Sequence, residues 1–162
     1  MCDRTTEPRT ESVWDYPRPP RVEPVPHRIR VIVDGVTIAD STRAMRVLET
    51  SHPPNYYLPP EDVRMDLLSA GRGRSVCEWK GSAAYHHLRV GERVLEDVAW
   101  SYARPQPSFE AIASYLSFYP GRVTEAWVGD ERAVAQAGGF YGGWITSWIR
   151  GPFKGEPGTT GW

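Results

Sequence analysis

Alternating apolar and polar side chains predict short β-strands over much of this chain. In the stretch 28–39, RIRVIVDGVTIA, the side chains of Ile29, Val31 and Val33 fall on one face, because successive residues of a strand point to opposite faces. The Asp-Gly pair after them supplies the positive φ angles of a tight turn. This stretch therefore predicts a β-hairpin.

The same alternation continues further along the chain. In the segment 42–50, TRAMRVLET, the residues Met45, Val47 and Glu49 alternate as in a strand, while Ser41 could instead cap a short helix. The strand is the preferred interpretation. Four later segments also have strand character: SVCEWK (75–80), SAAYHHLRV (82–90), LEDVAWSYA (95–103) and VTEAWVG (123–129).

Helix signals are few. The segment 51–63, SHPPNYYLPPEDV, contains four prolines and predicts a stiff loop, a candidate pocket rim, that ends in a helical turn at residues 60–62. Ser108 is a candidate cap for a short helix that would turn Phe109, Ile112 and Leu116 towards a core. Many short strands with little helix indicate an all-β sandwich or open barrel.

Composition divides the chain into four parts. Residues 1–10 are polar and are expected to be disordered, and residues 11–27 mix aromatic residues with prolines, which favours an extended strap. The strands fall within residues 28–137. Residues 138–162 combine glycines with aromatic residues, which suggests a tail that folds back over the domain.

Length and charge restrict the classes of function. A chain of 162 residues with 40% hydrophobic residues can bury one sizeable core. The 19 basic and 20 acidic residues nearly cancel, so no strong field favours nucleic acid or an anionic membrane. The sequence shows neither a bilayer-length apolar run nor the apolar core of a signal peptide, and we expect a soluble cytoplasmic protein. In that compartment Cys2 and Cys77 stay reduced.

Cys77 and Lys80 are the first candidates for chemistry. If residues 75–80 form one strand, Cys77 and Trp79 face one side and Lys80 the other, so a bulge is needed to join them in one site. Cys77 could be a packed apolar residue, a thiol that contacts a ligand, or a nucleophile activated by a neighbouring cation or base. The adjacent His86 and His87 point to opposite faces, and with Cys77 they offer too few ligands for a metal site.

Glu49 and the aromatic residues suggest a pocket. Glu49 would bring a carboxylate to the edge of an apolar surface, where it either pairs with an arginine or has a raised pKa suited to proton transfer. The tryptophans could be core packing, or they could form a slot for a flat or cationic ligand. The candidate ligand-binding residues are Tyr56, Tyr57, Trp79, Tyr85, Trp100 and Tyr102.

Several motifs of the sequence are similar to those of a known family. The series IADS, RVLETSHPPNYYLPPEDV, VCEWKGSAAY, DVAWSY and SFYPGRV, in this order, closely resembles the bacterial domain-of-unknown-function 427 family. The segments ESVWDYPRPP, FYGGWIT and GPFKGEPGT are similar to those of its longer, actinobacterial members. The resemblance thus covers residues 11–162.

The resemblance implies a β-tent fold, in which two antiparallel sheets meet at a steep angle, as in methionine-R-sulfoxide reductases and the ligand-binding domain of cereblon. Many such relatives hold a structural zinc with paired C-x-x-C motifs, which this sequence lacks. We therefore expect neither this zinc nor any other metal or cofactor. A nucleotidyltransferase label is sometimes attached to the family, but recognisable phosphate-cradling glycines or acidic metal ligands are missing from the sequence.

Two classes of function follow from these observations. In the first, a groove walled by aromatic residues and rimmed by Glu49 binds a compact organic ligand. In the second, an enzyme acts on a small metabolite, with Glu49 or Lys80 as acid and base and Cys77 as nucleophile. A third alternative is self-association, for example as a homodimer, through the glycine-rich and tryptophan-rich tail.

Overall fold

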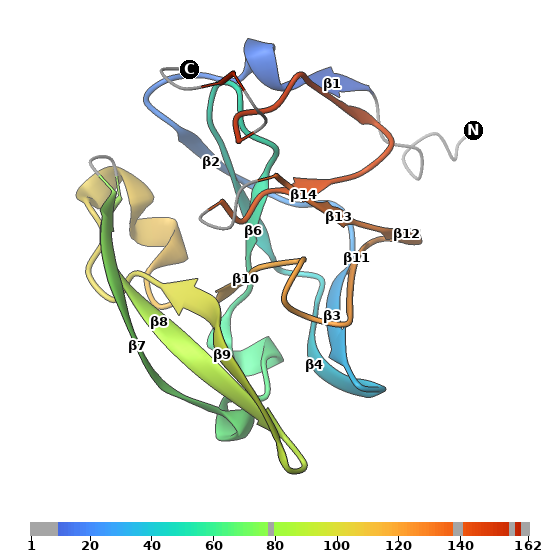
Figure 1. Ribbon diagram of the computed structural model, residues 1–162. Coiled ribbons are helices and arrows are strands. Elements are labelled where there is room, and N and C mark those ends of the chain that lie inside the picture. The colour runs from blue at the N-terminus through green and yellow to red at the C-terminus, as the bar shows by residue number, and fades with distance from the viewer. Residues whose placement is uncertain (1–9, 78–79, 138–140, 156–157, 160–162) are drawn as a thin grey trace.

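Two four-stranded antiparallel sheets provide most of the fold of the described residues (Figure 1). The computed structural model describes residues 10–77, 80–137, 141–155 and 158–159. In the first sheet the strands follow the order β10-β9-β8-β7. Its members are β7 (Leu68–Cys77), β8 (Gly81–Val90), β9 (Arg93–Ser101) and β10 (Ser117–Phe118). The prediction of an all-β protein is confirmed.

The second four-stranded sheet has the order β12-β11-β3-β4. Its members are β3 (Ile29–Val33), β4 (Val36–Ser41), β11 (Glu125–Val128) and β12 (Glu131–Arg132). The predicted hairpin is the pair β3 and β4, and its turn is formed by Asp34 and Gly35 at φ angles of 50° and 81°. These angles are the ones that an Asp-Gly pair adopts at low cost.

A three-stranded sheet, β2-β5-β6, lies against the two larger ones. It consists of β2 (Arg21–Pro24), β5 (Met45–Leu48) and β6 (Asn55–Tyr57). The strand predicted around Met45 is therefore confirmed, and it ends one residue before Glu49. In Figure 1, β6 lies between the sheet that contains β7, β8 and β9 and the sheet that contains β3 and β4.

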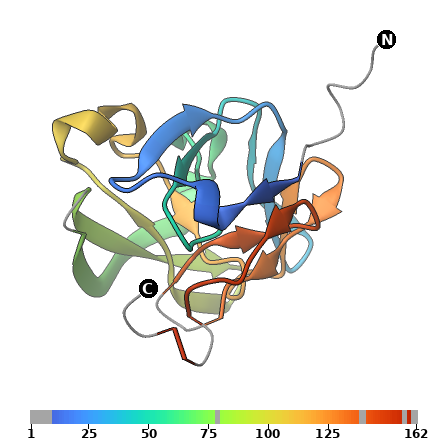
Figure 2. The ribbon, with the colours of Figure 1, turned by 90° about the horizontal axis from the view of Figure 1, so that it is seen from above.

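Both ends of the described chain are paired with the rest of the fold. Strand β1 (Glu11–Ser12) runs parallel to β15 (Ile149–Arg150), and the two segments lie side by side in Figure 2. Strand β14 (Trp144–Ile145) pairs with β13 (Val134–Ala135). The segment 11–27 is held by the buried Arg46, whose guanidinium binds both carboxylate oxygens of Glu11 at 3.0 Å and one of Glu23 at 2.7 Å.

Buried apolar residues form two separate clusters. The main core joins the two four-stranded sheets, because Ile29 and Val31 of β3 belong to the same cluster as Leu88 of β8 and Val98 of β9. It also contains Trp144. We call the smaller group the second cluster: Val47, Tyr57, Ala83, Trp100, Tyr102, Phe109, Ile112 and Tyr119.

Four 3-10 helical turns accompany the strands: Val13–Asp15, Pro60–Asp62, Met65–Leu67 and Pro107–Ile112, counted over the described ranges. The predicted turn at residues 60–62 is confirmed. The predicted cap at Ser108 is wrong, since Gln106 is the N-cap and Pro107 occupies the first turn, where a missing N–H costs nothing. Phe109, Ile112 and Leu116 are nevertheless buried, as predicted.

The strand predicted over residues 75–80 has different bounds. Strand β7 ends at Cys77, which pairs with Gly81, the first residue of β8, and Lys80 lies in the turn between them. Cys77 and Lys80 therefore need not face opposite sides, because the alternation of a strand no longer applies at Lys80. Within the described chain no helix is long and apolar enough to cross a membrane.

Candidate functional site

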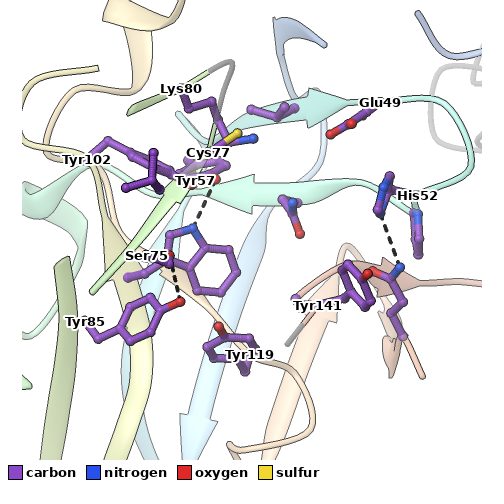
Figure 3. A pocket seen from close by; sticks show the side chains of 17 residues that line it. Glu49, His52, Tyr57, Ser75, Cys77, Lys80, Tyr85, Tyr102, Tyr119 and Tyr141 are labelled. Atoms are coloured by element: carbon purple, nitrogen blue, oxygen red, sulfur yellow. Dashed lines mark hydrogen bonds between the residues drawn. The ribbon is translucent and has the colours of Figure 1, made fainter. Parts of the chain in front are cut away.

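A cavity of about 260 Å³ lies beside the second cluster. Its walls come from β5 and β6, from the ends of β7, β8 and β9, and from segments near residues 52, 119, 136 and 141 (Figure 3). The lining residues are Val47, Glu49, His52, Pro53, Asn55, Tyr57, Ser75, Val76, Cys77, Lys80, Tyr85, Trp100, Tyr102, Tyr119, Gln136, Tyr141 and Gly142. Apolar and aromatic walls with a few polar groups are typical of small-molecule sites.

Trp100 is the centre of the aromatic wall. Its ring meets Tyr57 edge to face, with centroids 6.2 Å apart, and packs against Tyr119 at 4.6 Å. Its indole Nε1–H donates to the Tyr57 hydroxyl at 3.2 Å. Because both the ring contacts and the polar atom have partners, Trp100 is fixed in one orientation.

The tyrosine hydroxyls add polar groups to this aromatic wall. Tyr57 is fully buried, and burial raises its pKa well above the usual value. Burial likewise raises the pKa of Tyr102, whose ring centroid lies 6.4 Å from that of Tyr57. Tyr85 donates to the Ser75 hydroxyl at 2.9 Å. Tyr57 and Tyr102 therefore keep their protons over the physiological pH range.

Lys80 and Cys77 both line the cavity, and Figure 3 shows them close to Tyr102. Lys80 is only 6% exposed, and its Nζ lies 5.9 Å from the ring centroids of Tyr102 and Phe109. Its backbone carbonyl accepts a hydrogen bond from the N–H of Gln106, which anchors the turn. The turn thus brings together two residues that a continuous strand would have separated.

Glu49 is another of the residues that line the cavity (Figure 3). The carboxylate lies 3.8 Å from Nε of Arg18, whose side chain is 40% exposed. This is the arginine pairing that the sequence left as one of two alternatives for Glu49. An exposed pair at this distance contributes little to stability.

His52, Gln136 and Tyr141 form a polar corner that the sequence did not indicate. Nδ1 of His52 lies 3.4 Å from the Gln136 amide nitrogen, and its ring centroid lies 5.5 Å from that of Tyr141. Burial, together with the positive charges of Arg18, Lys154 and Lys80, lowers the pKa of His52 to about 4. His52 is therefore neutral at physiological pH.

The glycines of the C-terminal segment allow it to close this corner. A Cβ atom on Gly142 would overlap the six-membered ring of Trp100, so only glycine fits at this crossing. Gly143 donates its N–H to Oε1 of Gln136 at 3.1 Å. The segment thereby brings Tyr141 to the cavity wall.

The structure places the remaining candidate residues as follows. Tyr85, Trp100, Tyr102 and Tyr57 line the cavity, whereas Tyr56 points into the main core, where its ring centroid lies 5.1 Å from that of Trp144. The two tyrosines separate because neighbouring residues of β6 face opposite sides. Trp79 lies outside the described residues.

The histidines of β8 bind protein groups. Nε2 of His86 lies 2.8 Å from the Ser101 hydroxyl, and Nδ1 of His87 accepts the backbone N–H of Asp97 at 3.0 Å. Neither histidine lines the cavity. Among the residues with described positions, no group of three histidine, cysteine or acidic residues could hold a metal ion.

The described residues thus form an all-β protein with an aromatic pocket that Lys80 also lines. A family model described as Domain of unknown function (DUF427) matches residues 21–129. The chain belongs to this family, as the sequence motifs predicted. A comparison with curated proteins finds no match. Gln136, Tyr141 and Gly142 line the cavity from beyond the matched range.

Proposed function

We propose that this protein binds a small organic molecule in the cavity beside Trp100. The observation that carries the proposal is the composition of the wall, in which rings from several elements converge with a lysine, a thiol and an amide. Such polar groups are unfavourable inside an apolar core, because each buried polar atom without a partner costs free energy. Here Oδ1 of Asn55 is buried and has no hydrogen-bond partner among the described residues.

The size of the cavity restricts the ligand. A volume of about 260 Å³ is close to the lower end for small-molecule sites, which typically span roughly 300 to 1,000 Å³. The ligand we propose is therefore a compact metabolite, and neither nucleic acid nor a membrane is proposed as partner.

An enzyme that uses Glu49, Lys80 and Cys77 is the alternative. The three residues line one cavity, but in the described part of the chain no hydrogen bond or ion pair joins any two of them. General acid–base and nucleophilic catalysis need such groups within hydrogen-bond reach of each other or of the substrate. The binding function is therefore the one that the geometry favours.

A fragment screen by thermal shift tests the proposal. Fragments that bind in the cavity should raise the melting temperature of the wild type and lose this effect in Cys77→Phe, which places a ring where the thiol lines the cavity. The matched control is Val134→Phe, at a residue that is 64% exposed and does not line the cavity. If hits stabilise Cys77→Phe as strongly as the wild type, the cavity is not the binding site.

A further inference from the structure

Lys80 has a largely buried side chain, and its ammonium has no ionic partner among the described residues. The side chain is 6% exposed, and among residues 10–77, 80–137, 141–155 and 158–159 no carboxylate lies within salt-bridge distance of its ammonium. A buried charge is costly unless it is paired and hydrogen-bonded. The rings of Tyr102 and Phe109, at 5.9 Å, offer cation–π attraction, which returns only part of that cost.

Among the described residues, the charges around the cavity are more often positive than negative. Lys80, Arg18 and Lys154 all act on His52, where their charges disfavour protonation. The carboxylate that lines the cavity is that of Glu49, and it lies near Arg18. An entering anion would therefore meet more positive than negative charge.

One polar group of the wall, the Lys80 ammonium, suits an anion, whereas Oδ1 of Asn55 is an acceptor that would pair with a donor of the ligand. The hydroxyl of Tyr57 is fully buried, accepts the Trp100 indole N–H and interacts with the Tyr102 hydroxyl, so the ligand donor on this side of the wall is Lys80. The ammonium of Lys80 has three N–H donors and accepts nothing. Flat rings of Trp100, Tyr102 and Tyr119 surround these donors, and they offer faces and edges to a planar apolar body.

We propose that the ligand of this cavity is a small planar carboxylate, with its carboxylate group paired with Lys80 and its apolar body against Trp100. This inference rests on the proposed function, since it names the class of ligand for the same cavity. Charge-assisted hydrogen bonds between an ammonium and a carboxylate are about twice as strong as neutral ones. Recognition therefore depends on the charge of the ligand more than on its shape.

Benzoate and benzamide test this directly, because they share a shape and differ in charge. Each is titrated into the ¹⁵N-labelled full chain at neutral pH while the indole N–H signal of Trp100 is followed. Benzoate should bind roughly tenfold or more tightly than benzamide. Lys80→Met should remove this advantage, and Lys80→Arg should restore most of it.

Arg89→Met is the control, because Arg89 is an exposed cation on β8 and does not line the cavity. It should change the affinity for benzoate less than about twofold, as a distant and screened charge does. Folding of Lys80→Met is checked by its melting temperature, which should stay close to that of the wild type, since methionine keeps most of the apolar stem of the lysine side chain.

The outcomes separate the two proposals. If benzamide binds as tightly as benzoate, or if Lys80→Met keeps the preference for benzoate, the carboxylate assignment is wrong while the cavity remains a binding site. If neutral fragments move the Trp100 signal and benzoate does not, the carboxylate assignment again fails alone. If no fragment of either charge moves that signal, both proposals fail.

Discussion

Tyr56 and Tyr57 are neighbours on β6, and they lie in two different kinds of interior. Tyr56 packs in the main core against Trp144, and Tyr57 packs in the second cluster against Trp100. Both tyrosines are buried almost completely. The main core consists of packed hydrophobic side chains, whereas the second cluster borders a cavity that polar groups also line. One strand thus divides an interior that stabilises the fold from one that we propose binds a ligand.

The two tryptophans show the same division. The indole N–H of Trp144 donates to the backbone carbonyl of Phe118 at 3.0 Å, and its ring is fully buried. The indole N–H of Trp100 donates to a side-chain hydroxyl, that of Tyr57, and its ring is 6% exposed at the cavity. The difference teaches that burial alone does not distinguish a core residue from a pocket residue. The two kinds of residue differ in what faces the ring: packed side chains surround Trp144, whereas a cavity borders Trp100.

The largest expected effect is on the free energy of unfolding when either of the two tryptophans is replaced. Trp144→Ala should lower the free energy of unfolding by about 4 kcal/mol, because it empties a filled core. Trp100→Ala should cost less, about 2 to 3 kcal/mol, because one side of that ring already faces a cavity. Urea unfolding of both variants measures the difference. An equal or larger loss in Trp100→Ala would mean that the second cluster is an ordinary core.

The next effect depends on pH and concerns His52. Its pKa is about 4 in the folded protein and about 6.5 when unfolded, so the unfolded chain takes up the proton first as the pH falls. The stability that a neutral His52 provides is complete above pH 6.5 and is lost as the pH falls towards 4. The loss should reach at most about 3 kcal/mol, since 1.36 kcal/mol corresponds to one pKa unit.

His52→Asn isolates this contribution. Between pH 6.5 and 4.5 the unfolding free energy of the variant should fall less steeply than that of the wild type. Burial also lowers the pKa of His27, so the informative quantity is the difference between the two proteins. Parallel curves would show that His52 titrates normally and that the polar corner is open to water.

The strand pattern of the fold could be predicted from the sequence, because alternation and turn residues act locally. The turn at Asp34 and Gly35 and the burial of Ile112 follow from neighbouring residues alone. The family, too, was identified from its motifs. The extent of β7 was not: its first half was not predicted, and its Gly71 is needed because a Cβ there would overlap the Asp97 carboxylate of another strand.

The cavity could be predicted only in part, because its residues come from distant segments. Trp100 and Tyr102 were visible as aromatic residues of a strand, but His52 and Gln136 lie in irregular segments with no periodicity to read. Lys80 was placed on a strand because nothing in its own segment shows that β7 ends at Cys77. The glycines around Tyr141 were the one local signal that the C-terminal segment crosses close to another group.

A smaller effect on stability is expected when the hydroxyl of either tyrosine is removed. Tyr57→Phe should cost about 1 to 2 kcal/mol, because it leaves the buried Trp100 N–H without its acceptor. Tyr56→Phe should be nearly neutral, because the Tyr56 hydroxyl lies beside Arg46 but reaches no partner at hydrogen-bond distance among the described residues. Thermal unfolding of the pair provides the test. A larger loss for Tyr56→Phe would reverse the roles assigned to the two interiors.

The smallest effect concerns Glu49. Glu49→Gln should change the unfolding free energy by less than about 1 kcal/mol, because its pairing with the exposed Arg18 is weak. The same change should raise the affinity for benzoate slightly, by about twofold, since it removes a negative charge near the bound carboxylate. Calorimetric titration measures the affinity. A marked loss of benzoate binding would instead make Glu49 a direct ligand contact.

The distinction between a filled and a hollow interior is tested most directly by following two indole signals in one titration. Benzoate is added to the ¹⁵N-labelled protein, and the N–H resonances of Trp100 and Trp144 are recorded together. We predict a saturable shift of the Trp100 signal and a stationary Trp144 signal. A stationary Trp100 signal, or equal shifts of both, would contradict the assignment of the second cluster as the binding site.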